Sequence, residues 1–158
     1  MTRKDHAVPD DLIEDLLGIA PDSPLGVLRR RRPEALRHAE GAFRELLLPA
    51  DPGGLSHADR AALAMRVAER EGDAALAARY RAMLGDAPPS GPLLDALLAY
   101  ADKVAQTPEA TTRDDIDALA SLGLSSRDIV AATQLIAFVP YQVRAIAGLR
   151  ALLQETAA

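Results

Sequence analysis

The stretch LSHADRAALAMRVAEREGDAALAARYRAML, residues 55–84, sets the expected fold of this chain. Ser56 followed by Asp59 forms a capping-box pattern, which marks the first turn of a helix. Apolar residues then recur at helical spacing as far as Gly72, where a left-handed C-terminal stop is expected. An alanine-rich segment, 73–84, begins at once. The stretch therefore predicts a tight helical hairpin.

Helical periodicity also accounts for the rest of the chain. Cap residues, prolines and glycines divide it into helices expected over 10–17, 23–32, 33–48, 92–106, 111–123 and 124–155. Because no segment shows the alternation of a strand, we expect an all-α, multi-helix bundle. Residues 1–22 are expected to form an N-terminal extension with a short helix, and residues 23–158 a single helical domain.

The last of these segments, 124–155, gives the clearest indication of tertiary packing. Pro140 lies inside it, so a kink or a break is expected near residues 138–140. The part before the proline, IVAATQLIAFV (residues 129–139), is apolar nearly all round, which is typical of a helix buried on every side. In a chain of 158 residues, we expect part of that burial to come from a second subunit.

Composition excludes several classes of function. The chain carries a net charge of −5 and no cysteine, which argues against nucleic-acid binding and rules out disulfide, thiolate-metal and cysteine-peroxidase chemistry. The N-terminus lacks the apolar core of a signal peptide, and no apolar run is expected to span a membrane. We therefore expect a cytoplasmic protein. Its high alanine and arginine content is typical of a GC-rich bacterial genome.

The basic run Arg29–Arg32 ends at Pro33 and is followed by Glu34. The helix dipole favours cations at the C-terminal end of a helix. We interpret the run as a solvated helix end rather than a phosphate-binding patch.

The three histidines, His6, His38 and His57, do not form the pattern of a metal site. None has a second histidine four residues away on a helix, the spacing that a helical zinc site requires. A surface or capping role is expected for each of them. The sequence predicts no metal and no cofactor.

Polar residues inside the last apolar helix are a further group of candidates. Gln134, Gln142 and Arg144 interrupt an otherwise apolar sequence, and buried polar side chains need partners. They predict a structural polar network or a subunit contact, which we favour, or the polar lining of a small-molecule pocket.

Asp73, Leu76 and Tyr80 are spaced i, i+3 and i+7, which places them on one face of the second hairpin helix. Local chemistry gives each residue a structural role. Asp73 suits a helix cap, Leu76 suits the core, and the Tyr80 ring can pack while its hydroxyl meets a polar partner. This interpretation requires no active site.

The hairpin resembles the core of the AhpD-like or carboxymuconolactone decarboxylase superfamily. Redox members of that superfamily carry L-S-x-x-x-R-E and then G-C-x-x-C-x-x-x-H, and Leu55, Ser56, Arg60 and Gly72 match this outline. The C-terminal part, TTRDDIDALASLGLSS and the long apolar helix, is similar to the peroxidase-related branch. The resemblance covers roughly residues 28–153, and it implies an AhpD-like helical bundle that assembles into an oligomer.

This sequence differs from the superfamily at the residues that carry out its chemistry. The resemblance puts Asp73 at the first cysteine, Leu76 at the second and Tyr80 at the histidine, while Ala61 stands at the proton-relay glutamate. In the family a low-pKa cysteine attacks peroxide and a second cysteine closes a disulfide. Because both thiols are absent, thiol peroxidase activity of that kind is excluded.

Two functions remain open under this resemblance. The first is a non-redox, non-catalytic subunit of a homo-oligomer, or a partner of a cysteine-bearing AhpD-like relative. The second is a thiol-independent enzyme or a binder of small carboxylates. A helical adaptor unrelated to the family's site is a third alternative, and it would show a different fold.

The second function has named candidate residues. Asp73, Tyr80 and His57 are the candidates for catalysis. Arg60, Gln142 and Arg144 are the candidates for ligand binding, since an arginine can pair with a carboxylate. For Arg60 a structural ion pair is the alternative, and we favour it. This function requires Asp73, Tyr80 and Arg60 to converge on one cavity.

Overall fold

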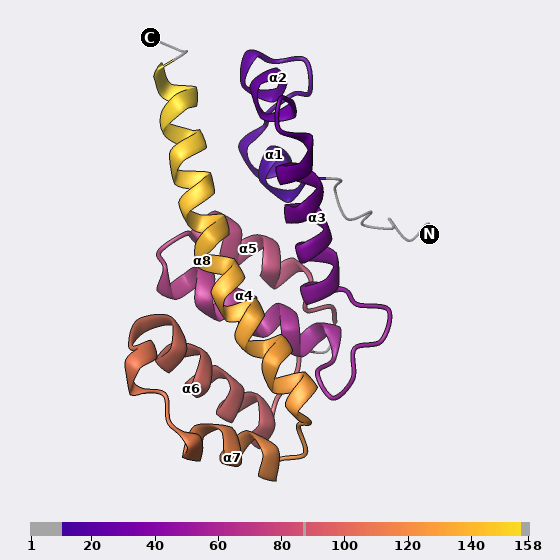
Figure 1. The fold of residues 1–158 in the computed structure, drawn as a ribbon, viewed down its shortest axis with the longest axis vertical. Helices are drawn as coiled ribbons and strands as arrows, with labels where there is room; N and C mark the ends of the chain where they lie inside the picture. Colours follow the sequence, from indigo (N-terminus) through magenta and orange to yellow (C-terminus); the bar gives the residue numbers. More distant parts are fainter. Residues whose placement is uncertain (1–10, 87, 156–158) are drawn as a thin grey trace.

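The computed structural model describes residues 11–86 and 88–155, and within that part all regular structure is helical (Figure 1). The elements are α1 (Leu12–Leu17), α2 (Pro24–Arg30), α3 (Pro33–Leu47), α4 (His57–Arg70), α5 (Ala74–Ala82), α6 (Pro92–Gln106), a 3₁₀ turn η1 (Pro108–Ala110), α7 (Arg113–Ser121) and α8 (Ser126–Glu155). The expectation of an all-α multi-helix bundle is confirmed for the described residues.

Helix α4 lies at the centre of the bundle and packs against α3, α5, α6 and α8. Figure 1 shows α8 crossing the whole molecule, with α6 and α7 near its N-terminal end and α1 and α2 toward its C-terminal half. The core side of α4 is formed by buried small and aliphatic residues: Ala61, Leu63, Ala64, Val67 and Ala68. Small side chains allow the neighbouring helices to approach α4 closely.

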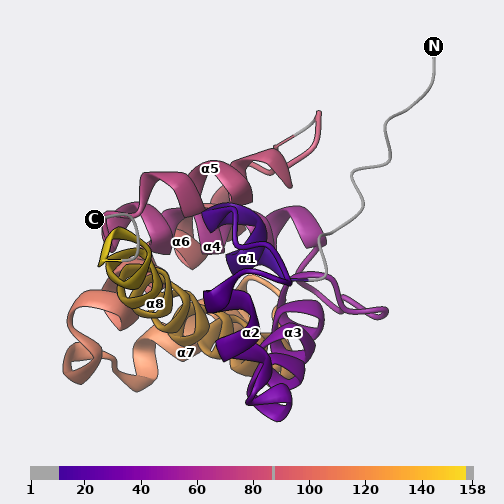
Figure 2. The same cartoon turned by 90° about the horizontal axis from the view of Figure 1, so that it is seen from above.

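The expected helical hairpin is confirmed. Ser56 and Asp59 form a reciprocal capping box at the start of α4. Gly72 adopts a left-handed φ of 82°, which is strained for residues with a side chain, and α5 begins two residues later. In the view from above, α4 and α5 run side by side (Figure 2).

Helix α8 passes through Pro140 without a break, so the break expected as one alternative is wrong, whereas the kink expected as the other stays a prediction. A proline inside a helix removes one backbone hydrogen bond and costs about 3 kcal/mol. Packing on both sides of the proline offsets this cost, because Ile136, Val139 and Ile146 are almost completely buried. Tertiary burial here overrides the local preference.

The outer side of α8 carries an uncharged stripe of residues that share one helix face. This α8 stripe consists of Val130, Gln134, Ala137, Tyr141, Ala145, Gly148 and Leu152. Val130 and Tyr141 are 55% and 49% exposed. Within one chain the segment 129–139 is therefore buried on one side only, and the second subunit that was expected to cover the other side stays a prediction.

By length and composition alone, α8 is also apolar enough to cross a membrane. The expectation that no apolar segment reaches this length is thus corrected, because the helix continues through Pro140. Its inner side, including Leu135 and Ile146, belongs to the core of the bundle. The fold therefore accounts for the apolar character of the inner side of α8, and the cytoplasmic location stays an expectation.

The arginine run at the end of α2 is only partly solvated. Arg29 forms ion pairs with Asp11 at 2.9 Å and Glu14 at 3.0 Å, and Arg30 pairs with Glu14 at 2.7 Å. Leu12 and Ile13 of α1 join the core of the bundle. These contacts attach α1 and α2 to the rest of the fold, whereas the domain boundary expected after residue 22 stays a prediction. His6 lies outside the described residues.

Asp128 joins the start of α8 to the loop before α4. One carboxylate oxygen accepts hydrogen bonds from the backbone and the hydroxyl of Ser125, at 2.9 and 2.6 Å, and the other accepts from the Gly54 N–H at 2.9 Å. The Ser125–Asp128 capping pair expected from the sequence is confirmed. A Cβ atom on Gly53 would lie 2.5 Å from the Asp128 carboxylate, so this approach requires glycine.

We predict that Asp128→Ala lowers the free energy of unfolding by about 1–3 kcal/mol, because it removes the cap of α8 and leaves the Gly54 N–H without its acceptor. The Ser125 hydroxyl lowers the pKa of Asp128. A lowered folded-state pKa gives stability that is present above the unfolded value of about 3.9 and is lost as pH falls through the folded value. Urea unfolding should therefore show a difference between the two proteins that shrinks in acid.

The matched control for this prediction is Asp114→Ala, which removes an exposed aspartate from the first turn of α7. Its effect should stay within about 0.5 kcal/mol. Equal losses for the two variants would show that Asp128 contributes no more than a first-turn charge.

Candidate functional site

The site expected from the resemblance lies at the start of α5, and its first residue acts as a helix cap. The Asp73 carboxylate accepts the Leu76 N–H at 2.9 Å. Its second oxygen lies 3.7 Å from the Arg150 guanidinium of α8. Asp73 is only 8% exposed. One of its oxygens therefore caps α5, and the other faces α8.

Leu76 and Ala61 contribute packing rather than polar chemistry. Both are completely buried in the core. A cysteine or glutamate at these positions would face apolar neighbours, and a buried carboxylate without a partner is costly. The two positions at which the expected resemblance places a second thiol and a relay carboxylate are thus structural in this chain.

Tyr80 is completely buried, and its hydroxyl donates a short hydrogen bond to the Gln142 side-chain oxygen of α8. Burial raises the pKa of the Tyr80 phenol well above its ordinary value, although the hydrogen bond to Gln142 acts in the opposite direction. The phenol therefore stays neutral at physiological pH. A group with such a pKa is poorly matched to acid–base catalysis near neutrality.

Arg60 holds the loop between α3 and α4. Its guanidinium donates to three backbone carbonyl oxygens, those of Leu46 at 2.9 Å, Pro52 at 2.9 Å and Leu55 at 3.1 Å. Burial lowers the pKa of Arg60, and the carbonyl oxygens replace the water that burial removes. Because these contacts already occupy the guanidinium, Arg60 is a structural residue in this conformation.

His57 supports the same loop, since its ring Nε2 lies 2.9 Å from the Pro49 carbonyl oxygen. Arg144 is exposed, and its guanidinium lies 3.8 Å from the Glu71 carboxylate. These two candidates therefore contact different parts of the fold. His57 contacts the loop before α4, and Arg144 contacts the hairpin turn.

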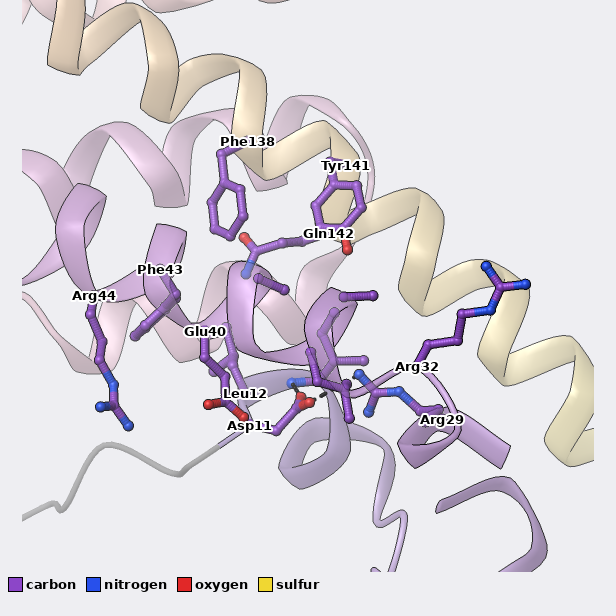
Figure 3. A pocket seen from close by; sticks show the side chains of 14 residues that line it. Asp11, Leu12, Arg29, Arg32, Glu40, Phe43, Arg44, Phe138, Tyr141 and Gln142 are labelled. Atoms are coloured by element: carbon purple, nitrogen blue, oxygen red, sulfur yellow. Dashed lines mark hydrogen bonds and ion pairs between the residues drawn. The ribbon is translucent and has the colours of Figure 1, made fainter. Parts of the chain in front are cut away.

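The structure has its best-formed cavity elsewhere, between α1, α3 and α8, with a volume of about 150 Å³. Gln142 lines this cavity, together with Phe43 and Glu40 of α3 and Phe138 and Tyr141 of α8 (Figure 3). Among the sequence candidates only Gln142 lines it. Phe43, Phe138 and Tyr141 gave no functional signal in the sequence, because isolated aromatic residues in helices are usually core residues.

The convergence that a thiol-independent enzyme requires is not seen in the three cavities described. Arg60 lines an open hollow beside the start of α8, whereas Asp73 and Tyr80 line none of the three. Tyr80 reaches the first cavity only indirectly, through its hydrogen bond to Gln142. Within the described part of the chain, no group of three or more histidine, aspartate and glutamate side chains could hold a metal ion.

Comparison with known proteins places this fold in a defined class. The structure is similar to the crystal structure of an uncharacterised peroxidase-related protein from Silicibacter sp. TM1040, with a TM-score of 0.56 and 18% identity over 73% of this chain and 68% of that chain. No protein-family model and no curated protein matches the sequence. The expected resemblance to the peroxidase-related fold is thus confirmed at the level of structure, in a chain that contains no cysteine.

We predict that Tyr80→Phe lowers the free energy of unfolding by about 1–2 kcal/mol, because the buried Gln142 oxygen loses its donor. A raised folded-state pKa gives stability that is complete below the unfolded value of about 10 and is lost as pH rises through the folded value. The difference in urea unfolding between the two proteins should therefore shrink in strongly alkaline solution. Tyr141→Phe, at a half-exposed position, is the control and should leave stability unchanged.

Proposed function

We propose that this protein is a non-redox helical subunit that associates with a second copy of itself through the α8 stripe. Two observations support this proposal. The residues that stand at the thiol and relay positions of the redox relatives cap, fill or brace the bundle, as Asp73, Leu76 and Tyr80 do. The outer side of α8, in contrast, carries exposed apolar residues such as Val130 and Tyr141.

The α8 stripe is the main observation that supports association. It runs from Val130 to Leu152, about 33 Å along the helix axis, and none of its residues is charged. Charged residues are depleted in the centres of protein interfaces, whereas apolar and aromatic residues are enriched there. A long uncharged face on a chain with 26% charged residues is therefore suited to association.

The surface beside the stripe has hollows that can receive side chains from a partner. One is lined by Val130 and Gln134 together with Leu46 of α3, and a second by Gln134 and Ala137. Small residues and hollows on a helix face allow a second helix to approach closely. Gln134 is the one polar side chain of the stripe, and a single polar residue in an apolar seam can fix the register of paired helices.

A cysteine-bearing relative of the same fold is the alternative occupant of this face. That partner would supply the thiols that this chain lacks, and the present chain would act as its non-catalytic companion. The proposal commits to a second copy, because the same uncharged face would then be covered on both subunits.

We predict that the wild-type protein is oligomeric at micromolar concentration and that Val130→Glu combined with Ala137→Glu makes it monomeric. Two carboxylates placed in an apolar contact would lose water without gaining partners. Mass photometry and light scattering after size exclusion measure the outcome directly. Far-ultraviolet circular dichroism should be unchanged, since both positions are exposed.

The matched control is Val27→Glu, because Val27 is 49% exposed on α2 and lies outside the stripe. This variant should keep the wild-type mass. A monomeric wild-type protein at micromolar concentration, or equal dissociation of both variants, would exclude self-association through α8. A monomer that forms a complex only with a cysteine-bearing relative would favour the alternative occupant.

A further inference from the structure

We infer that the cavity between α1, α3 and α8 binds a small neutral molecule that has an apolar body and one hydrogen-bond acceptor. The lining of this site comes from a single subunit, and it shares only Tyr141 with the α8 stripe, so binding can be tested in a variant whose stripe is altered elsewhere.

The walls of the cavity select an apolar body of limited size. Its volume of about 150 Å³ is similar to that of a dry protein cavity that accepts benzene. Leu36, Ala39 and Phe43 line it from α3. Phe138 and Tyr141 line it from α8, with their rings stacked at a centroid distance of 5.8 Å. A ring or a short branched chain would meet aromatic faces on one side and aliphatic groups on the other.

Gln142 supplies the polar contact. The residue is 2% exposed, and its oxygen is occupied by the Tyr80 hydroxyl. Within the described residues, its amide nitrogen donates no hydrogen bond, and Figure 3 shows the amide beside the Phe138 ring on the side that faces α3. The nitrogen is not among the fully buried side-chain atoms that lack a partner, and Gln142 lines the cavity, so the amide can donate into it. A ligand oxygen in the cavity would accept this hydrogen bond.

The charges around the cavity favour a neutral ligand. Arg29 is paired with Asp11 and Glu14, and Arg44 is also engaged in an interaction. The side chains of Arg32 and Glu40, which also line the cavity, form no hydrogen bond or ion pair with the described part of the chain. Because these two charges are of opposite sign, the lining has no strong preference for an anion or a cation.

Tyr80 acts as the positioning residue for this site. By occupying the oxygen of Gln142, its hydroxyl fixes which end of the amide is left for the cavity. The residue at the family's histidine position would thus orient a binding group through one hydrogen bond, without touching the ligand.

Acetophenone and toluene form a matched pair of probes, because they share a ring and differ mainly in the carbonyl acceptor. Titration of ¹⁵N-labelled protein followed by NMR should show acetophenone binding about three- to tenfold more tightly than toluene, the range that one net hydrogen bond supports. The side-chain amide signals of Gln142, assigned by their absence in Gln142→Leu, should shift with acetophenone. Benzoate and benzylamine, tested as the anion and the cation, should both bind more weakly than acetophenone.

Three variants separate binding from stability. Gln142→Leu should lose the preference for acetophenone and keep toluene binding, whereas Ala39→Leu should weaken both probes by filling the cavity. Tyr80→Phe removes the same hydrogen bond as Gln142→Leu and keeps the amide without fixing its orientation, so its preference for acetophenone should fall between those of the wild type and of Gln142→Leu. The Val130→Glu, Ala137→Glu double variant should bind as the wild type does, whatever its mass.

The inference would be overturned by the absence of acetophenone binding to the wild-type protein in the millimolar range. Equal affinities for the two probes would exclude Gln142 as the polar contact. Tighter binding of benzoate or benzylamine than of acetophenone would overturn the assignment of a neutral ligand. Unchanged binding to Ala39→Leu would place the probes outside this cavity.

Discussion

The close approach of several helices to α4 is the constraint on which the rest of the structure depends. Ala61, Ala64 and Ala68 are completely buried on the core side of this helix, and α5, α6 and α8 all pack against it. A core packed at this density does not accept larger side chains without displacement of its neighbours. The same constraint bears on chemistry at Ala61, which is completely buried. A carboxylate at this position would lose its water, and without a partner that loss is costly, so this core favours a small apolar side chain there.

The sequence predicted the parts of this fold that are encoded locally. The capping boxes at Ser56 and Ser125 and the turn at Gly72 each depend on residues within a few positions of one another, and all were confirmed. The path of α8 through Pro140 depends on burial by distant helices, which no local pattern reveals. The pairing of Arg29 with Asp11 could not be predicted from the sequence for the same reason, because 18 positions separate the two residues.

The candidate site could be predicted only in part. Gln142 was recognised because a glutamine inside an apolar helix is locally unusual, and it is the sequence candidate that lines the cavity. Its aromatic neighbours Phe43 and Phe138 come from helices far apart in the chain, and each is unremarkable in its own segment. Arg60 shows the opposite case, in which a conspicuous residue does not bind a ligand. Its residue type allowed a bound carboxylate, but three backbone carbonyls already hold its guanidinium. Residue type suggested a ligand, and only the geometry could show that the partner is the protein itself.

The hydrogen bond between Tyr80 and Gln142 connects α5 to the cavity. A histidine at position 80 could exchange protons near neutrality, whereas a buried phenol with a raised pKa cannot. The phenol provides a directional donor, and a neutral hydrogen bond holds a buried amide without the desolvation cost of an ion. A tyrosine at this position therefore fixes geometry and does not move protons. Because its hydroxyl occupies the Gln142 oxygen, Tyr80 sets which end of the amide is left for the cavity wall.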